Sequence, residues 1–151
     1  MNNPVKELIK ILPKKQLKDV LNQEICDIDI EFMGFIGIYK NLSQIIPQHF
    51  TIIDLGCAYN PQCFYFQRHK SYIAVDIDNT IKFKSKNCII YEEGIEKFIQ
   101  NEIQKYDLDE TFVICSYVPL KDEINKLIRE TFPNLFVFYP SNKKMMRILF
   151  K

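Results

Sequence analysis

The sequence has almost no net charge and no long apolar run. Its 151 residues carry 20 Lys and Arg against 19 Asp and Glu, a net charge of +1. This value indicates no global attraction to nucleic acid or to a membrane surface. No apolar run approaches the roughly 20 residues that a bilayer-spanning helix needs, and the first ten residues lack the apolar core of a signal peptide. We therefore expect a cytoplasmic protein with no membrane partner and with no nucleic-acid partner indicated by net charge.

Histidines are scarce, and the cysteines are not regularly paired. The two histidines, His49 and His69, fall outside the region where a catalytic pocket is expected, and a surface role is favoured for His69. The five cysteines are an odd number without regular spacing, which is typical of reduced, buried thiols. Cys57 and Cys63 flank one turn, but no second Cys or His pair stands at zinc-finger spacing, so we expect no metal site.

Apolar and aromatic residues are abundant enough for a substantial core. Hydrophobic residues make up 47% of the chain, with 12 Phe and 8 Tyr, which excludes a disordered protein. We find no repeat, low-complexity tract or linker. The length therefore indicates one domain spanning residues 1–151.

Short apolar runs alternate with segments of helical periodicity. The expected strands are 51–53, 72–75, 87–91, 111–115 and 135–139, and the expected helices between them are a short one from Pro61, then 94–104 and 120–132. This order predicts an α/β fold: a single-domain three-layer sandwich with a mostly parallel sheet of about five strands and right-handed crossovers.

The segments outside this alternation are less regular. Residues 1–47 are expected to form a helical N-terminal extension packed on the domain, with helices at 4–12, 14–23 and 31–46. Between the last two helices, residues 25–31 alternate Ile and Asp and are ambiguous. A reduced helix or an irregular segment is expected at 79–86, and the apolar segment 141–151 is expected to form a strand, a helix or an interface.

The stretch from Phe50 to Asp78 organises the rest of the chain. A buried strand ends at Asp54-Leu55-Gly56, Asn60 fits as an N-cap before Pro61, and a second strand ends at Asp76. A turn followed by an acid about 20 residues later is typical of a nucleotide-type site in an open α/β sheet. The alternative is a buried strand pair whose ends carry solvated aspartates.

These residues resemble class I, Rossmann-like S-adenosylmethionine-dependent methyltransferases. The resemblance is carried by Ile52-Ile53-Asp54-Leu55-Gly56-Cys57-Ala58-Tyr59-Asn60-Pro61, by Ala74-Val75-Asp76-Ile77-Asp78 and by Phe112-Val113-Ile114-Cys115-Ser116-Tyr117. It covers about residues 31–140 and implies a short, divergent methyltransferase-like protein that binds S-adenosylmethionine and transfers a methyl group to an unknown acceptor.

The resemblance also implies roles for individual residues. Asp54 would orient the methionine amino group, while Gly56 and Ala58 would let the turn pass beneath the cofactor. Asp76 would accept hydrogen bonds from the ribose hydroxyls, and Ile77 would pack on the adenine. At the end of the fourth strand, Ser116 and Tyr117 would line the space around the sulfonium.

The sequence departs from the family pattern at four places. Ala58 and Asn60 stand where the family turn usually has glycine, and Glu92-Glu93 is out of register with the usual adenine-reading acid. Only eleven residues follow Pro140, so the terminal β-hairpin is expected to be missing or reduced. The segment Ser116-Tyr117-Val118-Pro119 lacks the Asx/Ser-Pro-Pro-aromatic motif, which disfavours methylation of exocyclic amino groups of DNA bases.

Two other functions remain open. The first is a non-catalytic scaffold or interaction module with a degenerate methyltransferase fold, which the altered turn and the apolar C-terminal segment favour. The second is an NAD-type domain, which the absence of G-x-G-x-x-G disfavours. In a short methyltransferase, a partner subunit or a homo-oligomer would supply the substrate-binding region.

Overall fold

The structure is a computed structural model that describes residues 25–29, 35–77, 79–116, 121–140 and 145–150. Side chains are described within 38–77, 79–115 and 121–137. The helices predicted at 4–12 and 14–23, and the candidate residue Tyr117, lie outside the described residues.

In the described part of the chain, one mixed sheet of seven strands forms the middle layer, in the order β1-β7-β6-β5-β2-β3-β4. The strands are β1 (Ile25–Asp29), β2 (Thr51–Leu55), β3 (Ser71–Asp76), β4 (Cys88–Glu92), β5 (Thr111–Ser116), β6 (Leu135–Pro140) and β7 (Met145–Phe150). All neighbouring pairs among β2 to β6 are parallel. The predicted α/β fold with about five parallel strands is therefore confirmed.

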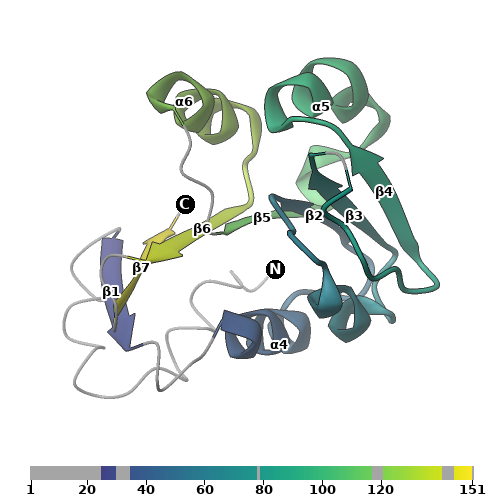
Figure 1. The fold of residues 1–151 in the computed structure, drawn as a ribbon, viewed down its shortest axis with the longest axis horizontal. Coiled ribbons are helices and arrows are strands. Elements are labelled where there is room, and N and C mark those ends of the chain that lie inside the picture. The colour runs from purple at the N-terminus through teal and green to yellow at the C-terminus, as the bar shows by residue number, and fades with distance from the viewer. Residues whose placement is uncertain (1–24, 30–34, 78, 117–120, 141–144, 151) are drawn as a thin grey trace.

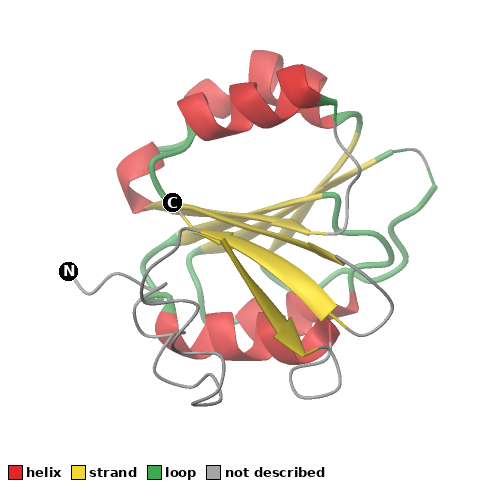
Figure 2. Cartoon of the chain, turned by 90° about the vertical axis from the view of Figure 1, so that its left-hand side faces the viewer, coloured by secondary structure: helices red, strands yellow, loops and turns green. Residues whose placement is uncertain are grey.

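Helices cover both faces of this sheet and complete a Rossmann-like three-layer sandwich (Figures 1 and 2). One face carries α4 (Phe35–Ile45) and the 3₁₀ helix η1 (Pro61–Phe66). The other carries α5 (Ile95–Glu102) and α6 (Asp122–Thr131). The helix expected from residue 31 is described only from Phe35 onward, and the short helix after Pro61 has 3₁₀ geometry.

Two hydrophobic clusters fill the spaces between the layers. Because successive strand residues point to opposite faces, Ile52 packs in the cluster with α4 and η1, whereas Ile53 packs in the cluster with α5 and α6. Both side chains are fully buried. This double burial explains why β2 has the continuous apolar sequence typical of a central parallel strand.

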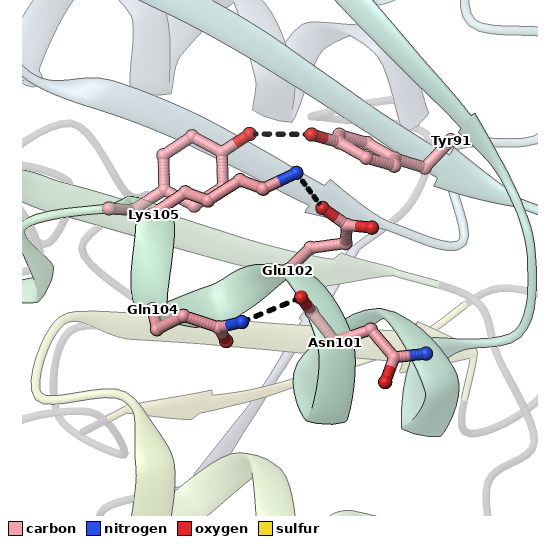
Figure 3. Close-up of polar contacts among 6 residues, drawn as sticks. Tyr91, Asn101, Glu102, Gln104 and Lys105 are labelled. Atoms are coloured by element: carbon pink, nitrogen blue, oxygen red, sulfur yellow. Dashed lines mark hydrogen bonds and ion pairs between the residues drawn. The ribbon is translucent and has the colours of Figure 1, made fainter.

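Polar contacts hold the end of α5 against strand β4 (Figure 3). The hydroxyl groups of Tyr91, in β4, and Tyr106 are 3.2 Å apart. Lys105, in the short helix η2 (Ile103–Lys105), pairs with Glu102, and its ammonium group lies 6.0 Å from the centre of the Tyr91 ring. A further 3₁₀ turn, η3 (Leu108–Glu110), then leads into β5.

The sheet is wider than predicted because two antiparallel strands extend it beyond β6. Strand β7 pairs with β6, and β1 pairs with β7. Among the described residues one strand follows β6, which agrees with the expectation of a reduced terminal hairpin. Strand β1 assigns an extended structure to residues 25–29, which the sequence left ambiguous, and pairs them with β7 near the C-terminus.

The connection between β3 and β4 contains no helix or strand in its described residues, 77 and 79–87. Ile81 nevertheless packs against the cluster beneath α4 and η1. This agrees with the expectation of an irregular segment at 79–86. Elsewhere, no helix in the described part of the chain is both long and apolar enough to cross a bilayer.

Candidate functional site

The carboxyl ends of three adjacent strands bring most of the predicted site residues to one edge of the sheet. In the register of the sheet, Leu55 of β2 lies beside Val75 of β3 and Cys115 of β5. Asp76 and Ser116 follow one residue later and end their strands. The chain leaves β2 toward β3 and later returns to its other side as β5. This reversal of direction is the place where open α/β sheets bind ligands.

The turn after β2 has an unusual backbone. Gly56, Ala58 and Asn60 have positive φ angles of 77°, 54° and 75°. Glycine adopts this left-handed region freely, and asparagine is one of the few other residues that tolerates it. The alternating conformation folds five residues tightly over the end of β3, where the amides of Gly56 and Cys57 donate to the carbonyl oxygen of Val75 at 2.8 and 3.2 Å.

Asn60 precedes η1 as predicted, but it does not act as a side-chain N-cap. Its left-handed backbone leaves the side chain without a capping hydrogen bond. Its side-chain nitrogen Nδ2 instead donates to the backbone carbonyl oxygen of Phe83 at 3.1 Å. The predicted position of Pro61 at the start of the helix is confirmed. Asn60 therefore joins the turn to the β3–β4 connection.

Asp76 holds the turn through both of its carboxylate oxygens. One oxygen accepts from the backbone amide of Ala58 at 2.8 Å, and the other accepts from the amide of Ile77 at 2.7 Å. Each carboxylate oxygen can accept more than one hydrogen bond. Asp76 is partly exposed, so acceptor capacity remains for the hydroxyl groups of a ligand.

Ile77 presents an apolar surface beside this carboxylate. Its side chain is 64% exposed, although burying an isoleucine is worth roughly 2 kcal/mol. A flat apolar ring placed on it would recover part of this free energy. An exposed isoleucine and a partly exposed aspartate are therefore neighbours in the chain at this edge of the sheet.

Among the predicted site residues, Asp54 has the position that least fits direct contact with a ligand. It is fully buried, on the face covered by α4 and η1. The Tyr39 hydroxyl donates to Oδ1 at 3.0 Å, and Gln62 Nε2 donates to Oδ2 at 2.9 Å. The hydroxyl of Tyr72 also donates to Oδ2. Side chains from α4, η1 and β3 thus surround one carboxylate beneath the turn.

Burial sets the protonation properties of this cluster. It raises the pKa of Asp54 to about 6, although the hydrogen bonds from Tyr72, Gln62 and Tyr39 act in the opposite direction. Burial, together with the neighbouring charge of Asp54, also raises the pKa of Tyr72 well above its usual value. Cys57 is buried as well, and burial raises its pKa. These shifts favour a structural thiol at Cys57 over a reactive one.

The sequence pattern did not reveal the partners of Asp54. Tyr39 falls within the helix predicted at 31–46 and Tyr72 within the strand predicted at 72–75, and the sequence pattern assigns no role to Gln62. The available signal was two tyrosines at core positions near an acid, because a buried phenol usually finds a hydrogen-bond partner. Gln62 could not be identified from spacing, although its amide also donates to the carbonyl of Cys57 at 2.8 Å.

Ala58→Gly is expected to raise the free energy of unfolding by about 0.5 kcal/mol. Relief of the left-handed alanine is worth roughly 1–2 kcal/mol, and the added flexibility of glycine in the unfolded chain offsets about 0.5–1 kcal/mol. Urea unfolding followed by circular dichroism measures the difference. The matched control is Ala74→Gly in β3, where the backbone φ angle is not positive. This control is expected to lower the free energy of unfolding. Destabilisation by Ala58→Gly would contradict the conformation described for the turn.

His69 is buried, which corrects the predicted surface role. It is 5% exposed, and its Nε2 lies 2.9 Å from the carbonyl oxygen of Ile46. A carbonyl oxygen only accepts, so Nε2 carries the proton. Burial lowers the pKa of this imidazole. His69 also lines a pocket of about 500 Å³ formed with residues 43–48, Tyr65 and Arg68, away from the turn and Asp76.

Within the described residues, no group of three or more His, Cys, Asp or Glu side chains is arranged to hold a metal ion. Cys57, Cys63, Cys88 and Cys115 are buried and free. No family model matches the chain, and comparison with curated proteins gives no match.

Proposed function

We propose that this protein binds S-adenosylmethionine at the turn between β2 and η1 and transfers its methyl group to an acceptor. The observation that carries the proposal is the position of this turn. It folds over the end of β3 at the point where the strand order reverses, and Asp76 and Ile77 lie beside it. Ligands of open α/β sheets bind in this position.

Each residue of the site has a role in the proposal. Asp76 accepts hydrogen bonds from the ribose hydroxyls, and Ile77 covers one face of the adenine. Gly56 and Ala58 let the cofactor approach the backbone, while Asp54 supports the turn from below and orients the amino-acid end through it. Ser116, which ends β5, lies at the same edge of the sheet, and with Tyr117 it lines the methyl-transfer space.

Methyl transfer needs orientation and a suitable electrostatic environment more than a dedicated catalytic group. The cofactor supplies an activated methyl group, and the protein positions it in line with the acceptor. As expected for a short methyltransferase, the proposal includes a partner subunit or a second copy that completes the acceptor site. Buried free thiols fit a reducing compartment, and the proposal places the protein in the cytoplasm.

The alternative proposal is a non-catalytic scaffold that keeps the fold. One observation favours it: the groups that would contact the cofactor already have partners inside the protein. The Asp54 carboxylate is buried among three donors, and the Ala58 amide donates to Asp76. In this alternative, the same contacts only stabilise the turn.

Calorimetric titration with S-adenosylmethionine and S-adenosylhomocysteine separates the two functions. The proposed function predicts saturable binding that Asp76→Ala largely abolishes. Ile77→Ser is expected to weaken binding about tenfold, because it removes apolar contact worth about 1.4 kcal/mol. Ile77 is exposed, so this second variant keeps the fold while testing the same site.

Asp109→Ala is the matched control, because it removes an exposed carboxylate from η3 on a different part of the chain. It is expected to bind like the unmodified protein. Absence of heat at millimolar ligand would exclude the cofactor and leave the scaffold function. Unchanged affinity in both Asp76→Ala and Ile77→Ser would show that the cofactor binds elsewhere.

A further inference from the structure

Exposed apolar side chains are concentrated on one part of the molecule. Six large apolar residues are exposed among the described residues, and five of them belong to the segment from 59 to 83. These five are Tyr59, Phe64, Tyr65, Ile77 and Phe83, with exposed fractions of 40% to 64%. Single exposed apolar residues are common, but neighbouring ones usually mark a contact surface.

Three of the aromatic residues are joined by direct contacts. The carbonyl oxygen of Tyr59 accepts from the amides of Lys82 and Phe83, both at 3.0 Å. The rings of Phe64 and Phe83 meet edge to face, with centroids 6.3 Å apart. The turn, η1 and the β3–β4 connection therefore form one continuous surface.

Anchored backbone keeps this surface in place although the connection is irregular. Ile81 packs on the core, and Ser85 is 4% exposed. The amide group of Asn87 donates to the carbonyl oxygens of Phe66 and His69 at 2.9 and 3.0 Å. The exposed rings thus project from a supported loop, so their exposure is a property of the fold.

Three lysines lie close to Phe83 in the sequence. Lys82 and Lys84 flank Phe83 in sequence, and Lys86 follows; all three are exposed. No ion pair among the described residues includes any of these lysines, and Lys82 Nζ donates only to the neutral carbonyl oxygen of Asn79, at 2.9 Å. Residues 59–91 contain five basic and two acidic side chains, net +3 against +1 for the whole chain, so the remainder is net −2.

We propose that the surface formed by Tyr59, Phe64 and Phe83 with Lys82, Lys84 and Lys86, here called the aromatic–lysine surface, binds single-stranded nucleic acid. Unpaired bases stack on the exposed rings, and the lysines neutralise the phosphates between them. Aromatic platforms combined with basic side chains are the usual chemistry of single-strand binding, and stacking tolerates any base.

The arrangement of the groups distinguishes this ligand from other anions. A duplex keeps the faces of its bases stacked inside and offers none to Phe83 or Tyr59. An anionic bilayer favours an apolar face that is separate from a basic one, whereas here Phe83 has Lys82 and Lys84 as its two neighbours along the chain. The inference does not require S-adenosylmethionine, because no cofactor atom takes part in these contacts.

Fluorescence anisotropy with a labelled single-stranded RNA of mixed sequence, about 12 nucleotides long, tests the inference. Phe83→Ala is expected to weaken binding about tenfold, since one base loses its stacking partner. The double variant Lys82→Gln, Lys84→Gln is expected to make the slope of log affinity against log salt shallower by about 1.4, because each phosphate contact contributes about 0.7. Both variants change exposed side chains, and circular dichroism verifies their folding.

Matched controls come from side chains away from this surface. Ile89→Ala removes an apolar side chain that is 47% exposed, close to the 45% of Phe83, and Lys97→Gln removes an exposed lysine from α5 on the opposite face. Both are expected to bind like the unmodified protein.

Three results would overturn the inference: no single-strand binding at low salt, equal binding of a duplex of the same length, or unchanged affinity in both surface variants. Binding to phosphatidylserine vesicles without binding to RNA would show that the surface contacts a membrane instead. Loss of S-adenosylmethionine binding in calorimetry would leave this inference intact, because the two ligands are measured separately.

Discussion

Replacing Asp54 with alanine is expected to lower the free energy of unfolding by about 4 kcal/mol. The change removes the acceptor of three buried donors: Tyr39, Gln62 and Tyr72. Leaving a buried polar group without a partner costs roughly 1–3 kcal/mol. The cost for Gln62 is smaller, because its amide retains the bond to the Cys57 carbonyl.

Urea unfolding at neutral pH measures this loss, and two variants calibrate it. Asp54→Asn keeps the shape and one carbonyl oxygen, and its amide can donate to a tyrosine hydroxyl, so it should lose less than half as much. Tyr39→Phe removes one donor and should cost about 1 kcal/mol. If Asp54→Ala unfolds the protein, these milder variants still test the cluster. A loss below about 1 kcal/mol in Asp54→Ala would show that Asp54 does not support the turn.

The stability of the protein should fall as Asp54 becomes ionised. Its pKa is about 6 in the folded protein, against 3.8 for a free aspartate. The folded state therefore binds the proton more tightly than the unfolded state does. This contribution to stability is fully present below pH 3.8 and is lost as the pH rises through 6. Between about pH 4 and pH 7 the expected loss is about 2 kcal/mol.

Comparison with Asp54→Asn isolates this effect from the other carboxylates. Both proteins share every other titrating group, so the difference in their unfolding free energies reports Asp54 alone. Urea midpoints measured in steps across this range should show the unmodified protein losing stability relative to the variant. A difference that stays constant with pH, or that grows in favour of the unmodified protein, would contradict the raised pKa.

The central strands and the helices on the α5 side were predictable because local sequence determines them. Residues 51–55 and 111–115 are buried on both faces, and their sequences are the apolar runs typical of central parallel strands. Amphipathic spacing placed α5 and α6 within a few residues. The alternation of strands with helices then predicted the parallel sheet, because a helix between two strands lets the chain return in the same direction.

Strands β1 and β7 could not be predicted in the same way. Ile25–Asp29 alternates Ile and Asp, a pattern compatible with several structures, and its partner is β7 at the other end of the chain. The pairing depends on two segments that carry no mutual signal in a single sequence.

The candidate site was predicted in part. The turn and Asp76 could be predicted, because glycine, proline and the spacing between two acids indicate such a turn within a short stretch of sequence. The buried position of Asp54 was missed, because it depends on hydroxyl groups supplied by α4 and β3. Side-chain contacts between distant elements leave no periodic trace in the sequence.

Pairing between β1 and β7 has a consequence for synthesis of the protein. Ile25 pairs with Leu149, 124 positions further along the chain. Among the strands that the structure describes, β1 lies at the edge of the sheet and pairs only with β7. During synthesis, the residues of β1 are made long before those of β7. Strand β1 therefore has no partner until the residues between the two strands have been synthesised. During that interval the outer edge of β6 is also open, and unpaired edges invite contact with other chains. Synthesis of β7 therefore gives both β1 and the outer edge of β6 their partner.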